Sequence, residues 1–326
     1  NNAPAFTSDS SFTINEGETA ITTVSATDAD GDSVTYNRTS DGDSYLFDIN
    51  TTTGELSFYT ARDYETPSDS DSDNIYSVTV TATDGFNTTE QVVLVTVANI
   101  SDSAPTFTSE DSFTADENQT AIGTVTASDL DGDTITYSLS GTDADSLTIN
   151  STSGVLTFLI APDYETKNSY EAVVTASDGY NASYQEISVS VININEHTPV
   201  ISSSATFSVT ENETNIGTVT ATDADGSDLT YSLVGLDADS LTINSTSGVL
   251  TFLSAPDYET KSTYTATAVV TDGDFSDSQD ITVNVTNIND NSPVISSSST
   301  FSALENQTAI GTVTAADADG DTITYS

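Results

Sequence analysis

The chain of 326 residues contains no cysteine, methionine or tryptophan, and basic residues are rare. The absence of cysteine excludes disulfides and cysteine-based metal sites, although it does not fix the cellular compartment. Only Arg38, Arg62, Lys167 and Lys261 oppose 51 acidic residues, which gives a formal net charge of −47. This charge argues against nucleic acids and anionic membranes as partners, since both require clustered basic side chains.

Long apolar runs are also missing, because the longest are only as long as a β-strand. We therefore predict no membrane insertion of this segment. A chain with this much negative charge repels itself, so we expect an elongated body, neutralisation by cations, or both. No signal peptide or initiator methionine is present, and the chain stops partway through a repeat, so we expect it to belong to a longer precursor.

Internal repetition is the strongest pattern in the sequence. An acidic loop begins at Asp28, Asp129, Asp223 and Asp317, at intervals of 101, 94 and 94 residues. Glutamates 16, 117, 211 and 305 and prolines 4, 105, 199 and 293 keep the same intervals. The spacing predicts three complete repeats and the first part of a fourth, over residues 1–101, 102–196, 197–290 and 291–326.

Within each repeat, apolar residues alternate with serine and threonine at every second position, which predicts half-buried antiparallel strands. With the segment near Phe113, the second repeat contains about seven such stretches, which is typical of an immunoglobulin-like sandwich. We therefore predict an all-β fold of tandem seven-stranded Greek-key β-sandwiches, arranged head to tail as a rod.

Acidic residues recur at the same places in every repeat. In the second repeat they are Glu117 after the first strand, Asp163-Tyr164-Glu165, the loop Asp129–Asp133, and Asp178. Polar connectors that end in proline join the repeats, at residues 99–105, 193–199 and 287–293. A single acidic cluster is usually a solvated loop, but the recurrence of the whole set with a connector favours a binding site.

Taken together, these motifs resemble the cadherin repeat, and specifically the bacterial cadherin-like domains of large surface proteins. The resemblance covers all 326 residues. It implies that calcium is bound between successive repeats, about three ions at a complete junction. In that family one domain supplies the glutamate, the Asp-x-Glu turn and the connector, and the next domain supplies the other two loops.

Carried over to this sequence, the resemblance implies three sets of ligands. The first junction has Glu16, Asp63, Glu65, Asn99, Ser101, Asp102, Asp129, Asp131 and Asp178, with the carbonyl of Ser103. The second has Glu117, Asp163, Glu165, Asn193, Asn195, Glu196, Asp223, Asp225 and Asp272, with the carbonyl of His197. The third has Glu211, Asp257, Glu259, Asn287, Asn289, Asp290, Asp317 and Asp319, with the carbonyl of Asn291.

The chemistry of calcium agrees with this assignment, because calcium takes about six to eight oxygen ligands from carboxylates, amides and carbonyls. Closely packed carboxylates cannot all stay ionised without cations. Asparagine replaces the first aspartate of the family's connector at positions 99, 193 and 287. Because Ser101 and Glu196 are further departures, we expect fewer ions at the first two junctions than at the third.

Other interpretations of these motifs are weaker. Asp28–Asp32 resembles the start of an EF-hand loop, but Ser33 and Thr39 stand where that loop needs glycine and glutamate. His197 is a conceivable transition-metal ligand, yet it is the sole histidine and replaces a residue used through its carbonyl. No nucleophile–base pair is evident, so we predict that the chain is not an enzyme.

We expect a calcium-rigidified extracellular stalk or fibre segment that mediates adhesion at the cell surface, with neighbouring repeats of the same protein as partners. One alternative is a module that recognises cell-surface glycans or like repeats, with Tyr64, Tyr164 and Tyr258 as weak glycan-binding candidates. Another is a self-assembling filament completed through residues 291–326. Asn-x-Ser/Thr sequons are weak indications of glycosylation.

Overall fold

The structure is a computed structural model that describes all residues from 1 to 326. It divides into two compact units, Asn1–Asp163 with Lys167–Ile192, and Tyr164–Thr166 with Asn193–Ser326. Its helical segments are short 3-10 turns, η1 (Ser44–Leu46), η2 (Ala144–Ser146) and η3 (Ala238–Ser240). No helix combines the length and apolar character needed to cross a membrane.

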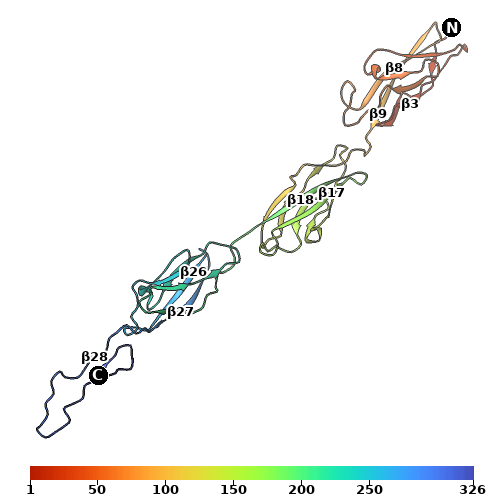
Figure 1. Cartoon of the computed structure of the whole chain (residues 1–326). Coiled ribbons are helices and arrows are strands. Elements are labelled where there is room, and N and C mark those ends of the chain that lie inside the picture. Colours follow the sequence, from red (N-terminus) through yellow and green to blue (C-terminus); the bar gives the residue numbers. More distant parts are fainter. The chain divides into compact units, whose positions relative to one another are not determined.

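The first unit contains two β-sandwiches, one around β8 and β9 and one around β17 and β18 (Figure 1). In the first sandwich, a four-stranded sheet in the order β2-β9-β8-β5 faces a three-stranded sheet in the order β3-β7-β6, and β1 pairs with β4. Its strands are β1 (Ala5–Phe6), β2 (Ser11–Asn15), β3 (Ala20–Thr23), β4 (Ala26–Thr27), β5 (Thr35–Arg38), β6 (Phe47–Ile49), β7 (Glu55–Phe58), β8 (Ile75–Thr83) and β9 (Thr88–Ala98).

The second sandwich repeats this topology, with sheets β11-β18-β17-β14 and β12-β16-β15 and the short pair β10-β13. Its strands are β10 (Thr106–Phe107), β11 (Ser112–Asp116), β12 (Ala121–Thr124), β13 (Ala127–Ser128), β14 (Thr136–Ser140), β15 (Leu147–Ile149), β16 (Val155–Phe158), β17 (Ser169–Ser177) and β18 (Ala182–Ile192).

The second unit holds a third sandwich with the same topology, in sheets β20-β27-β26-β23 and β21-β25-β24 and the pair β19-β22. Its strands are β19 (Val200–Ile201), β20 (Thr206–Thr210), β21 (Asn215–Thr218), β22 (Ala221–Thr222), β23 (Thr230–Val234), β24 (Leu241–Ile243), β25 (Val249–Phe252), β26 (Thr263–Thr271) and β27 (Ser276–Thr286). Beyond it, β28 (Val294–Ile295) pairs with β29 (Ala315–Ala316), and most apolar side chains of residues 291–326 are exposed.

One pairing in each sandwich departs from the antiparallel strands expected from the sequence. The first long strand pairs in parallel with the last, as in β2 with β9, where Asn15 lies opposite Ala98. The equivalent pairs β11–β18 and β20–β27 are also parallel. Because both strands run the same way, the chain enters each sandwich at one end and leaves it at the other.

The core of each sandwich follows from the alternation of apolar and polar residues. Along β8, the side chains of Tyr76, Val78, Val80 and Ala82 are buried, whereas the residues between them are more exposed. The ring of Tyr76 packs edge-on against that of Phe58, with 5.1 Å between the ring centroids. Edge-to-face aromatic pairs of this kind add to the stability gained from burial.

A glycine turn before β7 is required by close packing. Gly54 has a φ of 73°, and a Cβ atom at this position would lie 2.3 Å from the carbonyl oxygen of Val24. Gly154 and Gly248 occupy the same position in the next two sandwiches, with similarly short approaches. Only glycine accommodates both this φ value and this contact.

Candidate metal site

The buried glutamate that follows the first long strand organises the candidate site. Because β2 pairs with β9, Glu16 lies next to the start of the connector, and its backbone amide donates to the carbonyl of Ala98 at 3.0 Å. Its carboxylate, only 4% exposed, accepts hydrogen bonds from the amides of Tyr64 and Ile100, both at 2.8 Å. Glu16 therefore ties the Asp-Tyr-Glu turn to the connector.

The third sandwich repeats this arrangement within the second unit. Glu211, 2% exposed, accepts hydrogen bonds from the amide of Tyr258 at 2.8 Å and from that of Ile288 at 2.7 Å. The predicted ligands Glu259 and Asn287 are thereby brought to one end of the sandwich. In both units the amide of the turn tyrosine has a structural role.

The acidic loop of the following repeat closes onto the connector from the other side. Asp131 Oδ2 accepts hydrogen bonds from the amides of Asp102 at 3.1 Å and Ser103 at 2.9 Å. Its carbonyl oxygen accepts one from the Asn99 side chain at 2.9 Å. The first unit thus gathers predicted ligands from two successive repeats.

The second unit shows the same contact around Asp319, whose Oδ2 atom accepts hydrogen bonds from the amides of Asp290 at 3.1 Å and Asn291 at 2.8 Å. The carbonyl of Asp319 accepts one from the Asn287 side chain at 3.0 Å. The side chain of Asn291 also donates to Asp319 Oδ1, at 3.0 Å.

Carboxylates converge at both places. Glu16, Glu65, Asp102 and Asp131 each offer an oxygen, and these four oxygens lie within 4.8 Å of one another. In the second unit, the same is true of Glu211, Glu259, Asp290 and Asp319.

The protonation behaviour of these groups reflects their crowding. Burial, with the nearby charges of Glu16 and Asp131, raises the pKa of Glu65 to about 7. Burial, and then the charges of Glu16, Asp131 and Asp63, also raises the pKa of Asp102. Without a cation, such a cluster keeps part of its carboxylates protonated near neutral pH.

Several side-chain oxygens of the predicted ligands and of the neighbouring Asp133 in the first unit are buried without a hydrogen-bond partner. They are Glu65 Oε1, Ser101 Oγ, Asp129 Oδ2, Asp131 Oδ1, Asp133 Oδ2 and Asp178 Oδ2. Buried polar oxygens are nearly always satisfied, and calcium requires a set of hard oxygens such as this one. The residues present therefore fit a divalent cation, because these carboxylate and hydroxyl oxygens have no hydrogen-bond donor in the protein.

The ligands predicted for the second junction are divided between the two units. Glu117 and Asp163 belong to the first unit, where Glu117 is 2% exposed and its amide donates to Ile192. Glu165, Asn193, Asn195, Glu196, His197, Asp223, Asp225 and Asp272 belong to the second.

His197 has a side-chain contact that was not predicted from the sequence. Its Nδ1 atom lies 2.7 Å from Asp225 Oδ1, while Asp225 Oδ2 accepts hydrogen bonds from the amides of Glu196 and His197. The hydrogen bond to Asp225 raises the pKa of His197. Both oxygens of Asp225 are therefore engaged, whereas Asp131 in the first unit keeps Oδ1 without a partner.

Other predicted residues contribute in different ways. Asp63 Oδ1 accepts hydrogen bonds from the amides of Glu65 and Thr66, and so stabilises the turn. The side chain of Asn289 donates to Asp321 Oδ2, a residue absent from the predicted ligands. Asp133 is also absent from the predicted ligands, and one of its carboxylate oxygens is buried without a hydrogen-bond partner. The sequence does contain a signal for this residue, because it is the third aspartate of an Asp-x-Asp-Gly-Asp loop.

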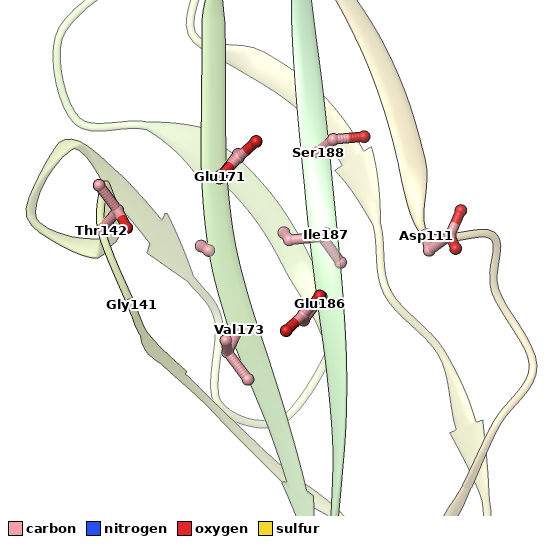
Figure 2. A pocket seen from close by; sticks show the side chains of 9 residues that line it. Asp111, Gly141, Thr142, Glu171, Val173, Glu186, Ile187 and Ser188 are labelled. Atoms are coloured by element: carbon pink, nitrogen blue, oxygen red, sulfur yellow. The ribbon is translucent and has the colours of Figure 1, made fainter.

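Another acidic feature lies on the sheet of the second sandwich. A groove of about 400 Å³ is lined by residues that include Glu171 on β17, Glu186 on β18, and Asp111 just before β11 (Figure 2). All three side chains are exposed, so water already solvates their charges. This groove contains none of the predicted ligands.

The chain matches the model of one known protein family in each of its three sandwiches. The model of the cadherin domain matches residues 10–98, 111–195 and 205–286. The chain belongs to the cadherin family. Cadherin domains are adhesion domains, so the prediction that the chain is not an enzyme is confirmed. Cadherin repeats generally bind calcium at their junctions.

Relatives extend this result along most of the chain. It is 30% identical to human Protocadherin Fat 1, over 90% of this chain and 7% of that protein. It is 32% identical to mouse Cadherin EGF LAG seven-pass G-type receptor 2, over 83% of this chain and 10% of that protein. The chain thus spans a tenth or less of the length of these cadherin relatives.

The crystal structure of mouse cadherin-23 EC22-24 is similar in fold, with a TM-score of 0.70 and 25% identity, and the match covers 88% of this chain and all of that one. The predicted fold of tandem all-β cadherin-like sandwiches is confirmed. The bacterial subgroup named from the sequence has no support, because Protocadherin Fat 1 and the seven-pass receptor are human and mouse proteins.

Proposed function

We propose that this chain is a segment of an extracellular adhesion protein at the cell surface, in which calcium holds successive cadherin repeats at a fixed angle. The ions bind at each junction, about three at a complete one and fewer at the first two. The proposed repeats span residues 1–101, 102–196, 197–290 and 291–326. Its partners are calcium and neighbouring repeats of the same longer protein.

The buried oxygens without hydrogen-bond partners in the first unit carry this proposal. Asp129 Oδ2, Asp131 Oδ1 and Asp178 Oδ2 belong to the second repeat, whereas Glu65 Oε1 and Ser101 Oγ belong to the first repeat and its connector. Hydrogen bonds from the amides of Asp102 and Ser103 to Asp131 already join the second repeat to the connector, and an oxygen of Asp131 lies within 4.8 Å of one of Glu65. An ion that binds both groups adds a cross-link between the repeats.

The charge of the cluster supports a cation in particular. No basic side chain pairs with Glu65, Asp102 or Asp131. Burial, and then repulsion by neighbouring carboxylates, raises the pKa of both Glu65 and Asp102. Calcium removes this repulsion, so calcium-free junctions are expected to be more flexible than loaded ones.

A calcium titration of the whole chain by calorimetry tests the proposal, with Asp129→Asn as the variant. Asparagine keeps the Oδ1 acceptor that holds the amide of Asp133, so the loop remains folded. We expect the variant to lose about tenfold in calcium affinity at one class of sites. The charge-matched control Asp48→Asn lies on the exposed side of β6 and should bind like the wild type. Identical titrations of both variants would refute the assignment.

A further inference from the structure

A separate acidic loop occurs only in the first sandwich, just before β8. In the second repeat a single residue, Lys167, separates Thr166 from Asn168, whereas residues 67–73 separate Thr66 from Asn74 in the first. This loop carries aspartates at positions 69, 71 and 73. None of them is among the junction ligands predicted above.

The three carboxylates converge. Asp69, Asp71 and Asp73 each offer an oxygen, and the three oxygens lie within 4.8 Å of one another. Asp71 and Asp73 are exposed, so an ion from solvent can reach them.

The buried member of the group indicates what is missing. Asp69 is only 6% exposed, and its Oδ2 atom accepts a hydrogen bond from the amide of Asp73 at 2.8 Å. Its Oδ1 atom is buried and has no hydrogen-bond partner. A cation bound at this atom would give it the partner that buried polar atoms normally have.

The three aspartates have the spacing of the first ligands of a calcium loop, as Asp28, Asp30 and Asp32 also do, but this loop is not an EF-hand. Such loops place oxygen ligands at positions 1, 3 and 5 and need a glycine at position 6, where the chain turns sharply. Counted from Asp69, position 6 is Asn74, which has a φ of 64°. Position 12, which supplies a glutamate in EF-hands, is the buried Val80. The remaining ligands must therefore be carbonyl oxygens and water.

The protein supplies no cation to this loop. In the second sandwich, Lys167 pairs with Asp143 beside η2. The corresponding Asp43, 2% exposed, instead accepts a hydrogen bond from the amide of Ser70 in the acidic loop, at 3.0 Å. The nearby Arg62 does not compensate, because its guanidinium donates to neutral groups, including the Thr60 carbonyl.

We propose that Asp69, Asp71 and Asp73 bind one calcium ion at a site separate from the junction sites. This site does not depend on calcium at the junctions, and the second and third repeats lack it. Because it has no bidentate glutamate, we expect weak binding, with a Kd of about 10⁻⁴ to 10⁻³ M, in the range of extracellular calcium modules.

Hydrogen exchange of the whole chain, followed by mass spectrometry, tests this site directly. The variant is Asp71→Asn/Asp73→Asn, which removes two charges at exposed positions and keeps an acceptor for the amide of Ile75. The charge-matched control is Asp41→Asn/Asp48→Asn, also exposed and in the same sandwich.

We expect calcium chloride at ten times Kd to slow exchange in residues 70–74 about tenfold in the wild type and the control, but not in the variant. The peptide over residues 99–105 reports the junction separately. Unchanged exchange of residues 70–74 in the wild type would refute the loop site. Equal protection in the variant would also refute it, because that protection would then come from elsewhere. A response of the loop without a response of residues 99–105 would support this site and count against the junction proposal.

Discussion

Replacing Glu65 by glutamine should have opposite effects on the metal-free and the calcium-loaded first junction. In the metal-free state the change removes one charge from a crowded group of carboxylates, and Glu65 Oε1 has no hydrogen bond to lose. In the loaded state the same change removes a carboxylate ligand. We therefore expect Glu65→Gln to stabilise the protein without calcium and to weaken its response to calcium.

The pKa of Glu65 determines by how much the variant should stabilise the protein without calcium. It rises from an ordinary value of 4.5 to about 7, and one pKa unit corresponds to about 1.4 kcal/mol. Ionised Glu65 therefore costs the metal-free folded state at most ~3 kcal/mol at pH 8. Water and salt screen a partly exposed group, so we expect a gain of about 1–2 kcal/mol in the free energy of unfolding.

Thermal unfolding at pH 8, in chelator and in calcium, measures both effects. In chelator, the variant should melt about 4–16 °C higher, because each of the 1–2 kcal/mol shifts the Tm of a domain of this size by about 4–8 °C. In calcium, its affinity should fall about tenfold, or about 1.4 kcal/mol. The control Glu90→Gln lies at an exposed position of β9 and should change neither value. A variant that melts lower by the same amount in both conditions would show that Glu65 serves packing only.

The site and the core support three further predictions. Without calcium, the stability of the wild type should fall as pH rises through 7, because Glu65 is protonated below about pH 7 in the folded chain but only below about pH 4.5 in the unfolded chain. Urea unfolding at pH 5.5 and at pH 8 checks this. Equal free energies of unfolding at the two pH values would contradict it. Gly54→Ala should lower the free energy of unfolding by about 2–4 kcal/mol, because the new Cβ atom would lie 2.3 Å from the carbonyl oxygen of Val24. Gly85→Ala has open space at its Cβ position and should lower the free energy of unfolding clearly less, as measured by the same chemical denaturation. In an array with a complete fourth repeat, calcium titration of matched two-repeat fragments should show the junction at Asn287 binding most tightly and the junction with Ser101 losing calcium first. The reverse order would refute the ranking.

Much of the fold could be predicted from the sequence, because alternation along a strand reports directly which side chains are buried. The pattern around Tyr76 and Val78 is an example. Alternation does not report which strands are neighbours, however. The parallel pairing of β2 with β9 therefore became visible only in the structure, although it is what places Glu16 beside the connector.

The candidate site was predictable in outline, because its motifs recur at constant spacing. Individual contacts were not, since they depend on side-chain directions. The contact between His197 and Asp225 is one case, because the sequence suggested a role for the His197 carbonyl only. Asp69 is another: in the sequence the loop changes only the repeat length, whereas the structure shows that this aspartate is buried with one oxygen unpaired.

Small-angle X-ray scattering of the whole chain, in calcium and in chelator, tests the central claim most directly. If calcium fixes the angle between successive repeats, chelation should reduce the maximum dimension and broaden the distance distribution. Circular dichroism should remain that of β-sandwiches, because the cores do not depend on the ion. An unchanged maximum dimension in chelator would contradict the proposal that calcium rigidifies the junctions.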